Sequence, residues 1–135
     1  MSMVLLDTNA YAGLLTGDQE VLGALANAET VLMSVIVLGE LHAGHRGGSR
    51  RRENEKRLLA FLRKSTVRIL EVSARTAEVF GEIKHGLKKA GTSIPINDIW
   101  LAAHAVQTGA TLVTYDGHFA KVPGLLLWDG FPSPG

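Results

Sequence analysis

Cysteine is absent from this 135-residue chain. Its absence excludes disulfide bonds, thiolate zinc sites and cysteine nucleophiles, and it is typical of proteins from a reducing compartment. The sequence also lacks an apolar run long enough to span a bilayer. Residues 1–7 show no basic region followed by a long apolar stretch, so we expect no secretory signal. These absences predict a soluble cytoplasmic protein with no membrane partner.

A strong excess of one charge is lacking as well, because the net charge is +1. The composition, 46% hydrophobic and 20% charged, is that of a globular domain. The basic residues that are present gather in one segment, where Arg46, Arg50, Arg51 and Arg52 lie within seven positions. Such a cluster attracts a phosphate-rich partner such as RNA, and its usual alternative is a solvated helix start beside a flexible loop.

Short apolar runs alternate with amphipathic stretches from one end of the chain to the other. The runs predict strands over residues 3–6, 30–35, 67–72, 111–114 and 125–128. The stretches between them predict helices over about 21–26, 37–43, 50–64, 74–90 and 99–107, with Ser73 as an N-cap and Gly44, Gly91 and Gly109 as stops. This alternation predicts one α/β domain over residues 1–131, with three α/β/α layers around a mainly parallel sheet. Residues 132–135 are expected to be a frayed tail.

Four carboxylates stand where these elements begin or end. Asp7 and Asp116 follow predicted strands, Glu40 lies in the first turn or so after another, and Asp98 starts a helix. Open parallel sheets bind ligands outside the carboxyl ends of their strands, so we expect the four acids to share one site. So much like charge is unfavourable unless divalent cations such as Mg²⁺ or Mn²⁺ neutralise it. The polar neighbours expected to orient the acids or bound water are Asn9, Asn97 and Thr114.

Taken singly, each acid has an ordinary structural explanation. Asp7 fits an Asx-turn, Glu40 an exposed helix position, Asp98 an N-cap and Asp116 a turn before glycine. Taken together, these explanations weaken, because all four acids fall at the one edge where open sheets bind ligands. The joint pattern therefore favours metal-dependent phosphodiester chemistry.

Four short motifs surround these acids: LDTN at 6–9, SVIVLGEL at 34–41, NDIWLAAHA at 97–105 and TYDGHF at 114–119. Each motif is weak alone, but their order and spacing together are specific. With them the chain resembles the PIN-domain family over nearly its whole length, and within that family the VapC-type toxins of prokaryotic type II toxin–antitoxin pairs.

The resemblance implies a Mg²⁺- or Mn²⁺-dependent endoribonuclease whose acidic quartet is Asp7, Glu40, Asp98 and Asp116. Asp7 and Asp98 would be the strongest metal ligands, while Glu40 and Asp116 would act through water or at a second metal position. Metal-activated water would then hydrolyse RNA phosphodiesters, in loops of transfer or ribosomal RNA, and leave 5′-phosphate and 3′-hydroxyl ends. The polar positions that support the site in this family correspond to Thr8, Asn9 and Thr114.

The resemblance also implies two protein partners. One is a second copy of the chain in a homodimer, and the other is a cognate VapB-type antitoxin whose C-terminal segment docks over the site. Segment 46–62 would form part of the antitoxin groove, since Leu58, Leu59, Phe61 and Leu62 offer apolar surface. Core packing explains these residues equally well.

Three histidines lie near these features. His118 is two residues from Asp116 and is a candidate contact to substrate phosphate. His42 and His45 are three residues apart, which is metal-like spacing, but the sequence shows no third ligand close to them. The sequence therefore favours the oxygen-rich carboxylate site over a zinc site.

Other classes of protein fit less well. Phosphatases of the haloacid dehalogenase type need a second aspartate two residues after the first, and that position is Asn9 here. Receiver domains need paired early acids and a late lysine after a strand, and this chain has one early acid. The alternative that stays open is a non-catalytic module that binds RNA or protein on the same fold.

Overall fold

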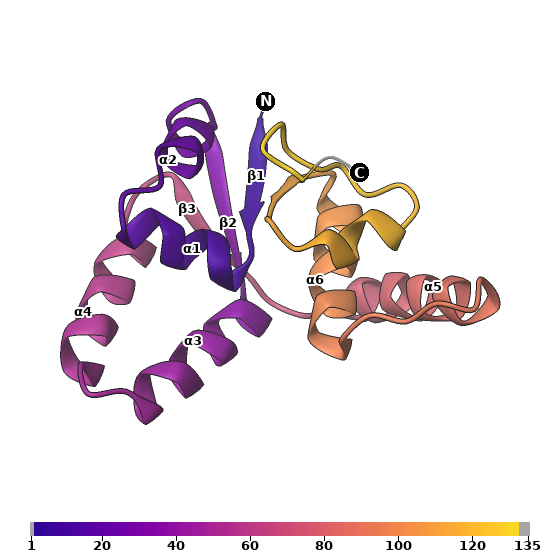
Figure 1. The fold of residues 1–135 in the computed structure, drawn as a ribbon, viewed down its shortest axis with the longest axis horizontal. Coiled ribbons are helices and arrows are strands. Elements are labelled where there is room, and N and C mark those ends of the chain that lie inside the picture. Colours follow the sequence, from indigo (N-terminus) through magenta and orange to yellow (C-terminus); the bar gives the residue numbers. More distant parts are fainter. Residues whose placement is uncertain (1, 133–135) are drawn as a thin grey trace.

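The computed structural model describes residues 2–132, so most of the predicted tail, residues 133–135, lies outside the described part of the chain. A four-stranded sheet forms its centre (Figure 1). All neighbouring strands pair in parallel, in the order β3-β2-β1-β4, which confirms the predicted parallel sheet. The strands are β1 (Met3–Leu6), β2 (Thr30–Ser34), β3 (Val67–Leu70) and β4 (Thr111–Val113).

Helices cover both faces of the sheet and complete the three predicted layers. In Figure 1, α1, α2 and α4 lie on one side of the strands, and α5 and α6 lie on the other. None of the helices described is long and apolar enough to cross a membrane. The helices are α1 (Thr8–Leu15), α2 (Gln19–Ala26), α3 (Val35–Gly47), α4 (Arg51–Leu62), α5 (Ala74–Lys89), α6 (Ile96–Thr108) and the 3₁₀ helix η1 (Gly117–Lys121).

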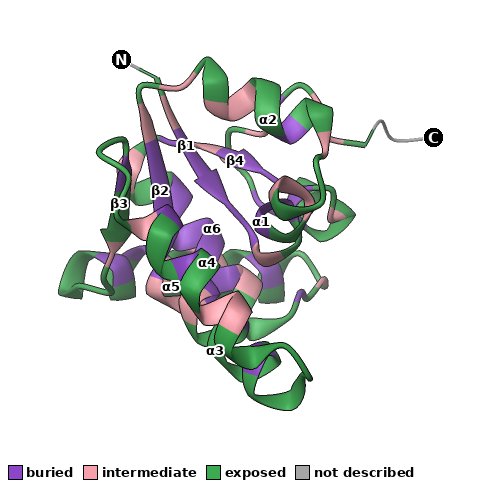
Figure 2. Ribbon diagram, turned by 90° about the vertical axis from the view of Figure 1, so that its left-hand side faces the viewer, coloured by how far each residue is buried: buried purple, intermediate pink, exposed green. Residues whose placement is uncertain are grey.

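The core lies between the sheet and these helices (Figure 2). Leu5, Leu6, Met33 and Leu112 have no exposed surface, because β1, β2 and β4 are covered on both faces. Burying a side chain of this size contributes roughly 1.5–3 kcal/mol relative to leaving it in water. The buried strands therefore form a rigid base for whatever follows their carboxyl ends.

The structure fixes the starts of two helices that carry or adjoin acids of the predicted site. Asp7, which fits an Asx-turn by sequence, is instead the N-cap of α1, a helix that the sequence did not predict, because its Oδ1 accepts from the Ala10 N–H at 2.7 Å. Asp98 does not cap its helix. The cap residue is Pro95, so Asp98 lies in the first turn of α6 with its side chain free for other contacts.

Two further predictions of elements were wrong. Helix α3 continues through Gly44 to Gly47, where a stop was expected, since a single glycine in a helix costs only about 1 kcal/mol. Residues 125–128 form no strand, and only Leu127 pairs with Leu112 in an isolated parallel bridge. The predicted cap of α5 is confirmed, because Ser73 and Thr76 form a reciprocal capping box.

Candidate active site

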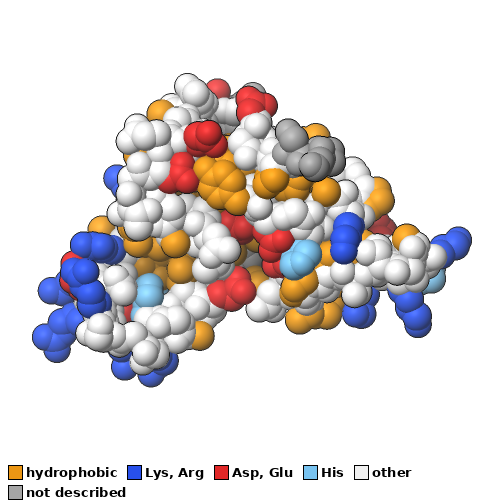
Figure 3. All heavy atoms as spheres, viewed as in Figure 1, with side chains coloured by type: hydrophobic (Ala, Val, Ile, Leu, Met, Phe, Trp, Pro, Cys, Tyr) orange, Lys and Arg blue, Asp and Glu red, His pale blue; other side chains and the backbone are white. Residues whose placement is uncertain are grey.

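The four predicted acids come from four different elements that meet at the carboxyl edge of the sheet. Asp7 follows β1 and Asp116 follows β4, and these two strands are neighbours. Glu40 lies in the second turn of α3, slightly farther from the end of β2 than predicted, because α3 begins at Val35 directly after β2. Asp98 lies on the first turn of α6. In Figure 3, acidic side chains gather in the hollow between the arm formed by α3 and α4 and the arm formed by α5.

A buried threonine connects two of the acids through hydrogen bonds. Thr114 has no exposed surface, and its hydroxyl donates to Oδ2 of Asp7. The same hydroxyl accepts from the backbone N–H of Asp116 at 2.9 Å. Because Oδ1 of Asp7 is held by Ala10, both oxygens of this buried carboxylate have fixed partners. Thr114 thus sets the relative positions of Asp7 and Asp116, as expected of a polar neighbour.

A histidine lies close to both Asp116 and Asp98. Nδ1 of His118 is 3.0 Å from Oδ1 of Asp116 and 3.6 Å from Oδ2 of Asp98. The Asp116 Oδ1 atom also accepts from the His118 backbone N–H at 2.9 Å, at the start of η1. One ligand atom from each of Asp98, Asp116 and His118 lies within 4.8 Å of the others, which is a spacing that one cation could bridge.

Glu40 completes the group from the solvent side. Its Oε1 accepts from the Thr8 hydroxyl at 2.7 Å, so the predicted supporting residue Thr8 does contact an acid. Asn9 and Asn97 are exposed, and neither makes a side-chain hydrogen bond within residues 2–132. The supporting role expected of these two asparagines therefore stays a prediction.

The charges of the acids act on one another. Burial raises the pKa of Asp7 above its usual range, and the nearby charges of Asp116 and Glu40 raise it further, against the opposing hydrogen bonds from Thr114 and Ala10. Burial raises the pKa of Asp98 too, and the charge of Asp116 adds to it. Ionising all four carboxylates together is therefore costly without a counter-charge.

This donor set fits a hard divalent cation. Carboxylate oxygens dominate it, and Mg²⁺ and Mn²⁺ prefer such oxygens together with water. A cation here would also relieve the repulsion that raises the pKa of Asp7 and Asp98.

Comparison with known proteins agrees with this geometry. A family model of the PIN domain matches residues 4–125. The chain belongs to the PIN-domain family. Ribonuclease VapC2 of Rickettsia felis is 36% identical to this PIN domain over 108 residues, which cover 78% of this chain and 79% of that protein. This relative places the chain among the VapC-type members of the family.

Two solved structures resemble the PIN domain as well. VapBC2 from Rickettsia felis, bound to a DNA fragment from its promoter, matches with a TM-score of 0.81 and 32% identity, covering 93% of this chain and 97% of that chain. A toxin–antitoxin complex from Klebsiella pneumoniae matches with a TM-score of 0.70 and 26% identity, covering 91% and 95%.

The basic residues of this PIN domain lie beside the acids and not among them. Arg46, Arg50, Arg51 and Arg52 are all exposed where α3 connects to α4, and Arg50 pairs with Glu53. Figure 3 shows Lys and Arg side chains over the α3–α4 arm and over the far end of α5, with the acidic hollow between them. An anionic chain laid across this face would meet positive charge on both sides of the acids.

The apolar residues of segment 46–62 divide between core and surface. Leu58 and Phe61 are buried in the core, whereas Leu59 is 49% exposed. Only part of the apolar surface expected for an antitoxin groove is therefore available on α4.

One residue of the site was missed from the sequence. Trp128 is buried, and its Nε1 donates to the backbone carbonyl of Thr114 at 2.7 Å. It therefore fixes the strand end that carries Thr114 and Asp116. The nearest signal was the apolar run 125–128, which was interpreted as a strand and not as a support for the site.

Proposed function

We propose that this PIN domain, a single unit over residues 1–131, is a Mg²⁺- or Mn²⁺-dependent endoribonuclease and the toxin of a type II toxin–antitoxin pair. The observation that carries the proposal is the meeting of Asp7, Glu40, Asp98 and Asp116 at one sheet edge. The name of the Rickettsia felis relative, a ribonuclease, supports the activity. The likeness to toxin–antitoxin complexes supports the partner.

In this proposal the residues of the chain have distinct tasks. Asp7 and Asp98 would hold the cation, and Glu40 and Asp116 would support it through water or at a second metal position. Thr114 and Thr8 keep the carboxylates of Asp7 and Glu40 in place through the hydrogen bonds described above. When bound, Mg²⁺ or Mn²⁺ supplies a more acidic water and stabilises charge that develops on phosphate oxygens.

The charges around the acids suit an anionic chain such as RNA. Arg46, Arg51 and Arg52 contact backbone phosphates and hold the RNA across the acidic hollow, which makes binding dependent on salt. His118 lies beside Asp116 and Asp98 and contacts the phosphate at the point of cleavage. Water attacks phosphorus, the bond to the 3′ oxygen breaks, and the products carry 5′-phosphate and 3′-hydroxyl ends. The resemblance to VapC-type ribonucleases implies loops of transfer or ribosomal RNA as substrates, and the unstacked bases of such loops can be read by a protein.

The partners and the compartment belong to the same proposal. The PIN domain forms a homodimer and is neutralised by a VapB-type antitoxin, and it acts in the cytoplasm, where its RNA is found. Light scattering of the purified chain at micromolar concentration should show a dimer.

The deciding experiment is cleavage of total RNA by the purified chain with Mg²⁺, with Mn²⁺ and with EDTA. The Asp7→Asn variant is the matched comparison, because asparagine caps a helix about as well as aspartate does while it removes the charge. We expect discrete fragments that require both metal and Asp7. A pure sample that binds RNA equally well with EDTA and never cleaves it would instead establish the alternative, a non-catalytic binding module.

A further inference from the structure

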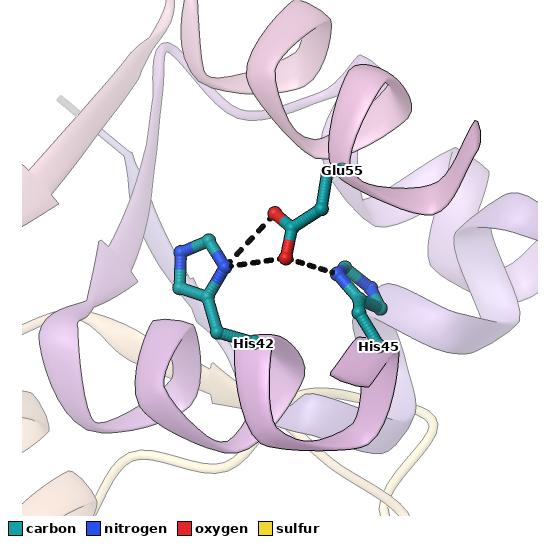
Figure 4. A group of neighbouring side chains, drawn as sticks. All are labelled: His42, His45 and Glu55. Atoms are coloured by element: carbon teal, nitrogen blue, oxygen red, sulfur yellow. Dashed lines mark hydrogen bonds and ion pairs between the residues drawn. The ribbon is translucent and has the colours of Figure 1, made fainter. Parts of the chain in front are cut away.

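A second group of potential ligands lies away from the carboxylate site, between α3 and α4 (Figure 4). It consists of His42 and His45 from α3 and Glu55 from α4, and we call it the histidine cluster. The Nδ1 atom of His42 is 2.9 Å from both carboxylate oxygens of Glu55. The Nδ1 atom of His45 is 3.2 Å from Oε1 of the same carboxylate. Figure 4 shows both imidazole rings turned toward Glu55.

One buried nitrogen of this cluster lies near a carboxylate without forming a well-aligned hydrogen bond to it. The His45 residue is 9% exposed, and its Nδ1 makes no hydrogen bond of acceptable geometry although Glu55 lies close to it. Burying a polar atom without a hydrogen bond is unfavourable, so such atoms are uncommon in folded proteins. The hydroxyl of Tyr11, on the neighbouring helix α1, is the other buried side-chain polar atom without a partner in residues 2–132.

The spacing of the three side chains suits a tetrahedral metal ion. Zinc binds nitrogen and carboxylate oxygen at about 2.0–2.2 Å, which puts neighbouring ligand atoms roughly 3.3 Å apart. The Nδ1-to-oxygen distances of 2.9 and 3.2 Å are close to this value. The ring centres of His42 and His45 are 6.2 Å apart, so the two imidazoles do not block each other.

The chemistry of the donors separates this cluster from the carboxylate site. Two imidazole nitrogens select Zn²⁺ and related borderline ions, whereas carboxylates and water suit Mg²⁺ and Mn²⁺. The side chain of His42 is 51% exposed and that of Glu55 is 32% exposed, so solvent reaches one side of the cluster. This open side leaves a fourth position for water.

We propose that His42, His45 and Glu55 form a Zn²⁺ site that joins α3 to α4, with water as the fourth ligand. Because two of the ligands come from α3 and one from α4, binding clamps the connection between the helices. The arginine-rich segment 46–52 lies within the loop that this clamp closes. Zinc therefore restrains the segment that carries Arg46, Arg50, Arg51 and Arg52.

Calorimetric titration of Zn²⁺ into the full, tag-free chain tests the site, with millimolar Mg²⁺ present to occupy the carboxylates. We expect one ion per chain in the wild type. Substitution His42→Gln or Glu55→Gln should weaken the affinity by roughly 100-fold, the upper end of what substitutions around metal sites cost. Both residues are partly exposed, so these variants should fold, and circular dichroism without zinc checks this.

Two matched variants show where the ion binds. His85→Gln removes an exposed histidine of α5 and should keep wild-type zinc affinity. Asp98→Asn removes a carboxylate of the other site and should also keep it. If Asp98→Asn loses zinc while His42→Gln keeps it, the ion belongs to the carboxylate site and the proposal is wrong.

A thermal readout complements the titration. At a hundredfold excess of Zn²⁺ over the wild-type Kd, the wild-type Tm should rise by roughly 5 °C or more, and the Tm of the His42→Gln variant should rise by no more than about 2 °C. Co²⁺ in place of Zn²⁺ should give the visible absorption of a tetrahedral site in the wild type alone. Titrations of the wild type without measurable heat, together with an unchanged Tm, would establish a plain ion pair between His42 and Glu55.

Discussion

Asp98 and Glu55 are both partly exposed carboxylates beside histidines, yet their surroundings shift their pKa in opposite directions. Burial and the charge of Asp116 raise the pKa of Asp98, and the nearby His118 offsets this only in part. The hydrogen bond from His42 holds the pKa of Glu55 below its usual range. The difference lies in the ratio of acids to bases, because one histidine faces several acids at the first site and two histidines face one acid at the second.

The ratio of acids to histidines determines which site needs positive charge from a bound cation or a partner. The carboxylate site has surplus negative charge that only a cation or a basic partner can neutralise. The histidine cluster balances its own charge when a histidine is protonated, and it offers two nitrogen ligands when both are neutral. Four measurements sharpen or break this comparison, and they follow in order of expected effect.

The largest effect should come from removing one charge of the carboxylate site. We expect Asp98→Asn to lower the rate of RNA cleavage by about 10²- to 10³-fold, the usual cost of deleting one preorganised electrostatic group. Glu82→Gln, at an exposed position of α5, is the charge-matched control and should keep the wild-type rate. Equal rates for both variants in a gel assay would show that Asp98 has no part in cleavage.

The next largest effect concerns Thr114, which is hydrogen-bonded to Asp7 and Asp116. Thr114→Val should lower the free energy of unfolding by about 2 kcal/mol, because it leaves Oδ2 of buried Asp7 without a donor and the Asp116 N–H without an acceptor. Urea denaturation measures this loss. Thr114→Ser keeps the hydroxyl and should retain most of the stability. Identical midpoints for wild type and Thr114→Val would mean that water replaces the hydroxyl at no cost.

A third measurement compares the two sites without metal. In EDTA at neutral pH, Asp98→Asn should raise the Tm by roughly 3 °C, or about 1 kcal/mol for a chain of this size, because it removes a charge that burial and Asp116 disfavour. Glu55→Gln should instead lower the Tm slightly, since it loses the bond from His42. A fall in Tm for Asp98→Asn would contradict the picture of surplus charge.

The smallest effect at neutral pH concerns His104, a buried histidine with no acid beside it. Its Nε2–H donates to the Glu71 carbonyl at 3.1 Å, so its Nδ1 accepts from the Ser34 hydroxyl at 2.9 Å. Burial lowers the pKa of His104, although the bond to Glu71 opposes this. The folded state therefore resists protonation, and the contribution of His104 is complete above the unfolded pKa of about 6.5 and is lost as the pH falls below it.

The test follows from this sign. Below pH 6.5, the free energy of unfolding should fall less steeply with decreasing pH in His104→Gln than in the wild type. The two slopes should differ by up to about 1.4 kcal/mol per pH unit, which is the value for one proton. Urea denaturation at several pH values gives both slopes. Parallel slopes would show that His104 is protonated equally in the folded and unfolded chains.

Much of the candidate site could be predicted from the sequence because its acids stand at the ends of short apolar runs. Asp7 and Asp116 were expected at the carboxyl edge for this reason, and the structure places them there. That they lie on neighbouring strands was not predictable, since alternation of elements does not set the order β3-β2-β1-β4. The start of α1 was missed because an aspartate before threonine and asparagine suits a turn as well as an N-cap.

In the histidine cluster, too, one part was predictable from the sequence and another part depended on the tertiary structure. The spacing of His42 and His45 on one helix is a local property, and it was visible in the sequence. Glu55 became the third member only because α3 runs on past Gly44 and α4 packs back against it. A stop at Gly44 would have left His45 outside the helix and the cluster incomplete.

The sequence by itself determined the alternation of strands and helices, the N-cap of α5 at Ser73, and the positions of Asp7, Asp98 and Asp116 beside element ends. All of these depend on hydrogen bonds and periodicity within a few residues. Only the tertiary structure decided which strands are neighbours, how Thr114 joins Asp7 to Asp116, and where Glu55 meets the two histidines. These contacts join residues from separate elements, up to 107 positions apart in the case of Thr114 and Asp7. They therefore depend on the packing of the core, which brings these elements together.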